Sequence, residues 1–192
     1  MSTWAPRLAV LLVLGCTFVY FLGAGSRTFA PSGDDDNAAV WAQISFMWTG
    51  AVATLILGLY VPINLYNGIA SLAVLACSLA LYEWARHVVW SRKFHVAWSG
   101  NVPDSVCAEG PYAYIRHPIY ASYILAFLAV LIAMPTVVTV IVFAFNVALF
   151  THAALSDERS LKSSPLATEY SQYQKRAGMF FPRILRSVSA AA

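Results

Sequence analysis

A group of polar and aromatic side chains stands at the start of one of the chain's apolar runs. Residues 110–120 read GPYAYIRHPIY. Arg116 supplies a planar, permanently charged guanidinium that can bind a carboxylate. His117 can donate or accept a proton, and Pro118 can begin a helix without losing a hydrogen bond. Flat aromatic faces that suit a ring or a cation come from Tyr112, Tyr114 and Tyr120.

A pair of carboxylates ends the apolar region that follows. This region runs over residues 119–155 and is interrupted once, at Met134 and Pro135. Its length suits two short helices that form a hairpin, with Pro135 starting the second. Because both ends of a hairpin lie at one membrane face, we expect Asp157 and Glu158 beside the arginine and histidine. Glu158 can accept hydrogen bonds from an amine or from sugar hydroxyls, and a helix amino terminus favours an anionic group. The pattern predicts a site for a small zwitterionic ligand.

Each of these side chains also has an ordinary explanation. Arginine, histidine and tyrosine at a membrane interface are usually anchors whose polar ends reach the water. Asp157 and Glu158 alone would be solvated charges after a helix. Only the combination of both groups at one face favours a functional site.

The composition places these groups in a membrane protein. The chain has 192 residues, of which 59% are hydrophobic and 11% are charged, whereas a soluble domain has about 25% charged residues. No basic stripe interleaved with aromatic residues indicates nucleic acid binding, so we expect no nucleic acid partner. Cys16, Cys77 and Cys107 are scattered without zinc-ligand spacing, which predicts neither a metal site nor a disulfide framework.

The apolar runs predict an all-α polytopic membrane protein of about five transmembrane helices. A spanning helix needs roughly 20 apolar residues. We read the whole chain, 1–192, as one membrane domain that ends in a helical hairpin and a cytosolic tail covering the site. The expected spans are residues 8–24, 38–61, 66–90, 119–134 and 136–155, and the tail is 156–192. Pro62 and Asn64 mark a tight turn between the second and third spans.

The basic residues predict the orientation of these spans. With five spans, one face receives only Arg7, and the other receives Arg27, Arg86, Arg92, Lys93, Arg116, Arg159, Lys162, Lys175, Arg176, Arg183 and Arg186. Cytosolic loops carry the excess of lysine and arginine. We therefore expect the amino terminus outside and the tail in the cytosol, in the inner membrane if the source is bacterial.

One acid, Glu83, lies inside an apolar run. A carboxylate within a membrane segment is a functional candidate by default. The alternative is an ion pair with Arg86 or His87 at helical spacing. The sequence leaves both interpretations open.

The ordered motifs resemble those of the isoprenylcysteine carboxyl methyltransferase family, in a wider group with phospholipid N-methyltransferases. The resemblance covers residues 104–182: GPYAYIRHPIY, the apolar hairpin, DERSL and ATEYSQYQKR. It implies S-adenosylmethionine as cofactor, bound on the cytosolic side under the tail, and a lipophilic acceptor. The candidate catalytic residues are Arg116, His117 and Glu158. The implied cofactor-binding residues are Asp104, Ser105, Val106, Cys107, Tyr112, His117, Pro118, Ile119, Tyr120, Glu158, Tyr170, Tyr173 and Arg176.

The chain also departs from the family pattern. Ser122 and Ala167 stand where the family has glycine, and Asp157 replaces the first acid of a Glu-Glu pair. Family members that modify prenylcysteine carry an arginine one turn before the cofactor glutamate, where this chain has Ala154. His152 projects from a different part of the helix. Cofactor binding is therefore better preserved than recognition of a prenylcysteine carboxylate.

The expected reaction is an in-line methyl transfer from a sulfonium. No dedicated base is evident, which favours an acceptor that is already nucleophilic or is deprotonated from solvent. Phospholipid N-methylation and small-thiol methylation remain alternatives. An NADPH-dependent sterol-type reductase also carries R-H-P-x-Y, but usually with asparagine after the proline, where this chain has Ile119. A non-catalytic scaffold is the remaining alternative, and the sequence defines no oligomeric state.

Overall fold

The computed structural model describes residues 4–28, 37–91 and 105–183. Helices account for nearly all regular structure there, and these residues contain no strand beyond one isolated bridge. The predicted all-α fold is confirmed. The helices are α1 (Trp4–Thr28), α2 (Asn37–Gly58), α3 (Leu65–Ser91), η2 (Gly110–Ala113), α4 (Pro118–Ala133), α5 (Val137–Lys162) and α6 (Ala167–Arg176).

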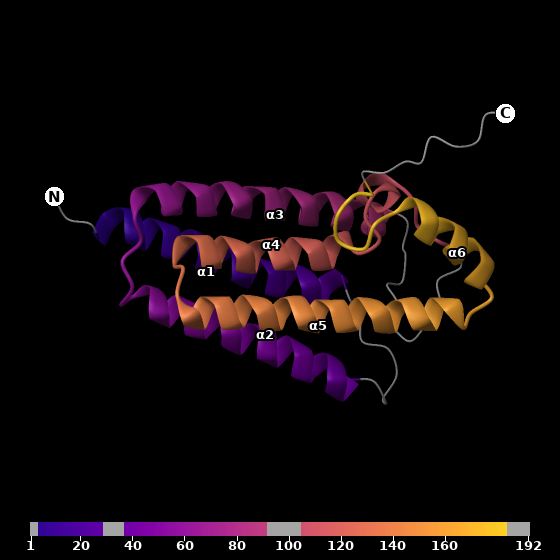
Figure 1. The fold of residues 1–192 in the computed structure, drawn as a ribbon, viewed down its shortest axis with the longest axis horizontal. Coiled ribbons are helices and arrows are strands. Elements are labelled where there is room, and N and C mark those ends of the chain that lie inside the picture. The colour runs from indigo at the N-terminus through magenta and orange to yellow at the C-terminus, as the bar shows by residue number, and fades with distance from the viewer. Residues whose placement is uncertain (1–3, 29–36, 92–104, 184–192) are drawn as a thin grey trace.

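Five helices, α1 to α5, run lengthwise beside one another, and α4 lies between α3 and α5 (Figure 1). Small residues let α3 and α4 approach closely. Ser71 donates to the Ala129 carbonyl at 2.7 Å, and Ser78 donates to the Ser122 carbonyl at 2.6 Å. Twelve of the sixteen residues of α4 are buried. The last residues of GPYAYIRHPIY begin α4. Because α4 is buried between its neighbours, the position of this motif is fixed.

Three helices contain segments long and apolar enough to cross a membrane: Arg7–Ala24, Leu65–Val89 and Val137–Lys162. The outer faces of these helices expose large apolar side chains, such as Leu12, Ile69 and Ile141, which suits contact with lipid. Trp48–Gly58 and Pro118–Ala133 are shorter apolar helices. At 16 residues, α4 is about 24 Å long, less than the roughly 30 Å of a bilayer core. The count of five spans stays a prediction.

The hairpin differs from its prediction at the start of α5. Pro135 precedes the helix, which begins at Val137 and is capped by Thr136. The Thr136 hydroxyl accepts from the Thr139 amide at 3.2 Å, and the Thr139 hydroxyl accepts from the Thr136 amide at 3.0 Å. This reciprocal capping gives the Thr136 and Thr139 amides hydrogen-bond acceptors. A helix that began at Pro135 would not form this pair of bonds.

The helix α5 also extends two turns beyond the predicted end at residue 155, to Lys162. Asp157 and Glu158, which were expected to close the fifth span, consequently lie within the helix and not at its end. The turn before α3 is as predicted, since α2 ends at Gly58 and the Asn64 side chain accepts from the Asn67 amide at 2.8 Å.

The tail returns to the bundle end through a short strap, residues 177–179. The Gly178 amide donates to the Tyr114 carbonyl at 3.0 Å, and the Arg116 amide donates to the Gly178 carbonyl at 2.7 Å. A Cβ atom at position 178 would lie 1.8 Å from the Phe181 carbonyl oxygen, so only glycine fits there. The strap thereby joins α6 to the segment in front of α4.

Candidate functional site

The predicted site residues gather at the bundle end that carries α6, where α4 begins (Figure 1). The helix η2 lies close against α3. A Cβ atom at Gly110 would come within 2.7 Å of the Val88 side chain, so the close approach requires glycine. Gly110 has a φ of +54°, a conformation that favours glycine. His117 is the residue before α4, and Pro118 is its first residue, as predicted.

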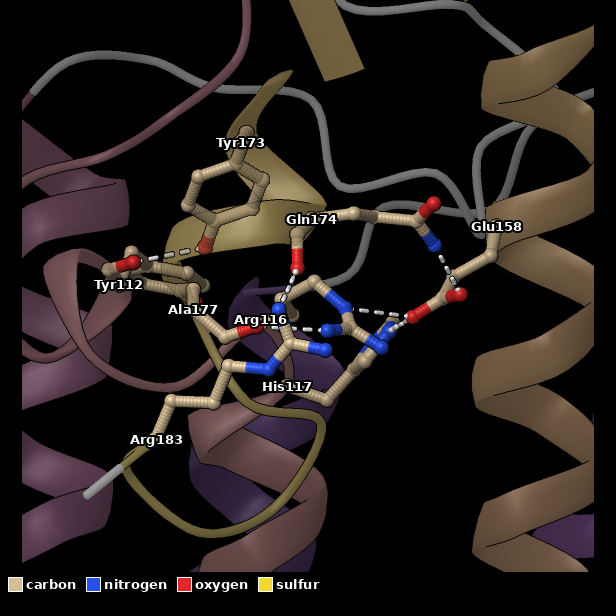
Figure 2. Close-up of polar contacts among 8 residues, drawn as sticks. All are labelled: Tyr112, Arg116, His117, Glu158, Tyr173, Gln174, Ala177 and Arg183. Carbon is tan, nitrogen blue, oxygen red and sulfur yellow. Dashed lines mark hydrogen bonds and ion pairs between the residues drawn. The ribbon is translucent and has the colours of Figure 1, made fainter. Parts of the chain in front are cut away.

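Glu158 is the centre of the site, with only 4% of its surface exposed. One carboxylate oxygen accepts from Arg116 Nε at 2.8 Å and lies 3.3 Å from His117 Nε2. The other oxygen accepts from Gln174 Nε2 at 2.6 Å. Figure 2 shows Arg116 and His117 approaching the carboxylate from the segment before α4, and Gln174 approaching it from α6. The hairpin geometry expected from sequence therefore does bring Arg116, His117 and Glu158 together, and their roles stay a prediction.

Arg116 is more constrained than an open fork for a ligand. Its Nη1 donates to the Ala177 carbonyl at 2.6 Å while its Nε binds Glu158 (Figure 2). A guanidinium presents three nitrogen atoms, and two of them are engaged within the protein. Arg116 thus links α5 to the strap and fixes the position of the carboxylate.

His117 is fixed through both its backbone and its ring. Its amide donates to the Met179 carbonyl at 3.1 Å. Its ring is parallel to that of Tyr120, with centroids 5.5 Å apart. We expected backbone amides at the start of α4 to be free to bind a ligand. The His117 amide is instead bound by the strap.

A second carboxylate lies beside the first with different partners. The Tyr120 hydroxyl donates to Asp157 Oδ2 at 2.9 Å. Tyr120 also stacks on Phe150 of α5, at a centroid separation of 5.7 Å. Asp157 is half-buried, which argues against the alternative that it is an ordinary solvated charge.

Three tyrosines cover the site from the tail and η2. The Tyr173 hydroxyl donates to the Tyr112 carbonyl at 2.7 Å, and the rings of Tyr170 and Tyr173 are 5.9 Å apart. Burial raises the pKa of Tyr112 and Tyr173, and nearby Cys107 adds to the shift. Burial also raises the pKa of Tyr170, with a further contribution from the charge of Glu158. All three phenols therefore stay protonated near neutral pH and can donate hydrogen bonds.

The remaining predicted cofactor residues differ in how they lie. Asp104 is outside the described residues, and Ser105 is exposed. Val106 packs against the Tyr170 and Tyr173 cluster. Arg176 is exposed and makes no hydrogen bond or ion pair with other residues that the structure describes, so it is not part of the Glu158 cluster.

Sequence reasoning missed Gln174 and the carbonyl of Ala177. Positions 170, 173, 174 and 177 recur with the spacing of one helical face, and all four are buried or half-buried. That periodicity in ATEYSQYQKRA was a signal for them. Tyr114, by contrast, was expected to offer a face to a ligand and is exposed.

Two departures from the family pattern have structural explanations. Ser122 is fully buried at the contact of α4 with α3, where its hydroxyl donates to the Ile119 carbonyl at 2.6 Å. It is thus a packing residue away from the Glu158 cluster. Ala154 lies one turn before Glu158 and is also fully buried. Position 154 therefore presents a methyl group, and not a positively charged side chain, to the apolar core.

Glu83 has the paired arrangement that was one of its two interpretations. Its carboxylate accepts from Arg86 Nη2 at 2.6 Å and Arg86 Nε at 3.1 Å. The Tyr20 hydroxyl also donates to it. Glu83 therefore forms an ion pair within α3 and links this helix to α1 through Tyr20.

Comparison with known protein families supports the resemblance. The model of the isoprenylcysteine carboxyl methyltransferase (ICMT) family matches residues 89–163. No curated protein and no solved structure matches the chain. The matched segment runs from the end of α3 to the end of α5 and includes GPYAYIRHPIY and DERSL. The resemblance predicted from these motifs is confirmed, and it indicates a membrane protein of the methyltransferase kind.

Proposed function

We propose that this chain is an integral membrane methyltransferase that uses S-adenosylmethionine, because its residues 89–163 match the ICMT family. Its methyl acceptor is lipophilic. The observation that carries the proposal is the buried Glu158 carboxylate, held between Arg116 and Gln174 at one end of an apolar bundle. A buried charge with this many partners belongs to a built site and not to a solvated helix end.

The chemistry of the donor set fits the cofactor. S-adenosylmethionine supplies a methyl group on a positively charged sulfonium. The Tyr170 hydroxyl is buried beside the Glu158 carboxylate and supplies a hydrogen-bond donor at this end of the site. Glu158 would accept hydrogen bonds from an amine or from ribose hydroxyls. Tyr112 and Tyr173 would offer aromatic faces, and His117 would face the carboxylate end.

For methyl transfer, the protein must orient the acceptor relative to the cofactor and exclude water from the site. The acceptor must be held about 3–3.5 Å from the methyl carbon, in line with the leaving thioether. α6 and the strap cover the bundle end, which supports a water-poor site entered by the cofactor from the cytosol. The exposed apolar faces of α1, α3 and α5 suit a lipophilic acceptor that arrives from the bilayer.

The described basic residues support an orientation of the chain in the membrane. Arg86, Arg116, Arg159 and Lys175 belong to the bundle end with α6, whereas Arg7 is at the opposite end, where it donates to the Gly58 carbonyl at 2.7 Å. This asymmetry supports a cytosolic site and tail with an external amino terminus.

Binding of the cofactor tests the proposal directly. Purified protein in detergent is titrated with S-adenosylmethionine and, separately, with NADPH. We expect saturable binding of S-adenosylmethionine alone. Binding of NADPH alone would favour the reductase alternative, and binding of neither would refute the proposal.

A further inference from the structure

The two adjacent carboxylates of α5 are treated differently by the fold. Glu158 pairs with Arg116 and His117, whereas no cation lies within ion-pair distance of Asp157 among the residues that the structure describes. The titratable groups that act on Asp157 are Tyr120, His117 and Glu158. A half-buried carboxylate without a cationic partner is costly, and a cationic ligand would offset that cost.

The surroundings of Asp157 also suit a cation. Its partner Tyr120 stacks with the ring of His117 and with the ring of Phe150, so the surroundings of Asp157 are aromatic. Aromatic faces attract ammonium and sulfonium groups. Ala154, one turn earlier on α5, brings no positive charge that would recognise an acceptor carboxylate.

Asp157 and Glu158 face different parts of the molecule. Glu158 is bound by Gln174 of the tail, on the side where the cofactor is proposed to enter. The partner of Asp157, Tyr120, packs in the apolar core with Phe150. The partner of Asp157 therefore lies on the side of the bundle, from which a lipophilic acceptor would arrive.

We propose that Asp157 binds the ammonium group of a lipophilic amine acceptor and takes its proton, which makes this enzyme an N-methyltransferase. The proposal rests on the proposed function above. The sequence placed Asp157 in the polar group at this face but did not indicate that it could act as a base.

Proton transfer to Asp157 precedes methyl transfer to the nitrogen. The ammonium transfers one proton to the Asp157 carboxylate and leaves a neutral amine. The nitrogen lone pair forms a bond to the methyl carbon, and the carbon–sulfur bond breaks with its electrons remaining on sulfur. The products are a methylated ammonium, a neutral thioether and a protonated Asp157, which returns its proton to water.

The same carboxylate could instead hold the sulfonium of the cofactor, because both ligands are organic cations. Two measurements separate these sources. If Asp157 holds the acceptor, Asp157→Asn leaves the affinity for S-adenosylmethionine unchanged. If it holds the sulfonium, the variant weakens binding of S-adenosylmethionine but not of the uncharged thioether S-adenosylhomocysteine.

The activity test uses three probes of one chain length in detergent micelles: dodecylamine, dodecanethiol and dodecanoic acid. Methyl transfer from radiolabelled S-adenosylmethionine is measured for the wild type, Asp157→Asn, Tyr120→Phe and the exposed control Glu169→Gln. We expect methylation of the amine by the wild type and the control. Loss of a general base costs about 100-fold or more, so Asp157→Asn should lose at least that in kcat/KM. Tyr120→Phe keeps the carboxylate and should lose less.

A pH profile distinguishes a base from a structural residue. With an alkylamine pKa of about 10.4, the neutral fraction of the probe rises about 100-fold between pH 7 and pH 9. Activity of Asp157→Asn should rise with it, whereas the wild type should change much less. A structural defect would show no such rescue.

Several results would overturn the inference. These are methylation of the thiol or acid but not the amine, full amine turnover by Asp157→Asn, or weaker binding of S-adenosylmethionine by that variant. Binding of S-adenosylmethionine without methylation of dodecylamine also overturns it, while leaving the proposed function intact. Absence of S-adenosylmethionine binding to the wild type refutes the proposed function and this inference with it.

Discussion

Replacement of Glu158 by glutamine probes the centre of the site with the least change of shape. The side-chain amide keeps one acceptor oxygen for Arg116 Nε. Its NH₂ group then faces Gln174, whose own amide can rotate and present its oxygen. The polar network closes again, so we expect Glu158→Gln to fold and to lose only the negative charge.

The magnitude follows from burial of the carboxylate. Only 5% of the Glu158 side chain is exposed, so solvent screens its interactions little. A hydrogen bond to a charged group contributes roughly 1.5–3 kcal/mol. At about 1.4 kcal/mol per tenfold, Glu158→Gln should bind S-adenosylhomocysteine roughly 10- to 100-fold more weakly.

Calorimetric titration of S-adenosylhomocysteine in detergent measures this loss. Glu169→Gln is the matched control, because Glu169 is exposed and glutamine retains an oxygen for its 3.4 Å contact with the Val106 amide. Asp157→Asn should change this affinity much less than Glu158→Gln. Unchanged affinity in Glu158→Gln would show that the glutamate does not contact the cofactor and that the site is misplaced.

Three further predictions address topology, the acceptor and the strap. Reporter fusions after Ala192 and within residues 34–36 should both report the cytosol, and an external signal at Ala192 would contradict the five-span arrangement. Farnesylated cysteine analogues should not be methylated, because Ala154 offers their carboxylate no cation, and efficient turnover would contradict this reasoning. Gly178→Ala should lower the melting temperature and S-adenosylhomocysteine affinity, since its Cβ would lie 1.8 Å from a carbonyl oxygen. Gly23→Ala, which meets nothing within 4 Å, should do neither.

The sequence predicted the parts of the site that depend on local pattern and connectivity. Arg116 and Glu158 meet because a short hairpin must return its chain to the face where it began. Pro118 begins α4 because proline costs no hydrogen bond at that position. These inferences needed only segment lengths and the residue types at segment ends.

The rest depends on tertiary contacts that no local pattern contains. The end of α5 was misplaced because its polar last turns are stabilised by packing under the tail, not by apolar composition. Gln174 reaches Glu158 only because α6 folds back over the bundle end. The partner of Asp157 could not be predicted for the same reason, since Tyr120 comes from the neighbouring helix.

The pairing of the strap with the segment before α4 affects the order in which the protein matures. Residues 177–179 are among the last described residues to be synthesised, yet they supply carbonyl acceptors to Arg116 and His117. The apolar helices can enter the bilayer before these partners exist. Membrane insertion and completion of the site are thus separate events during synthesis. A chain released before residue 177 carries all five bundle helices but leaves the guanidinium and the α4 entrance without the strap that fixes them.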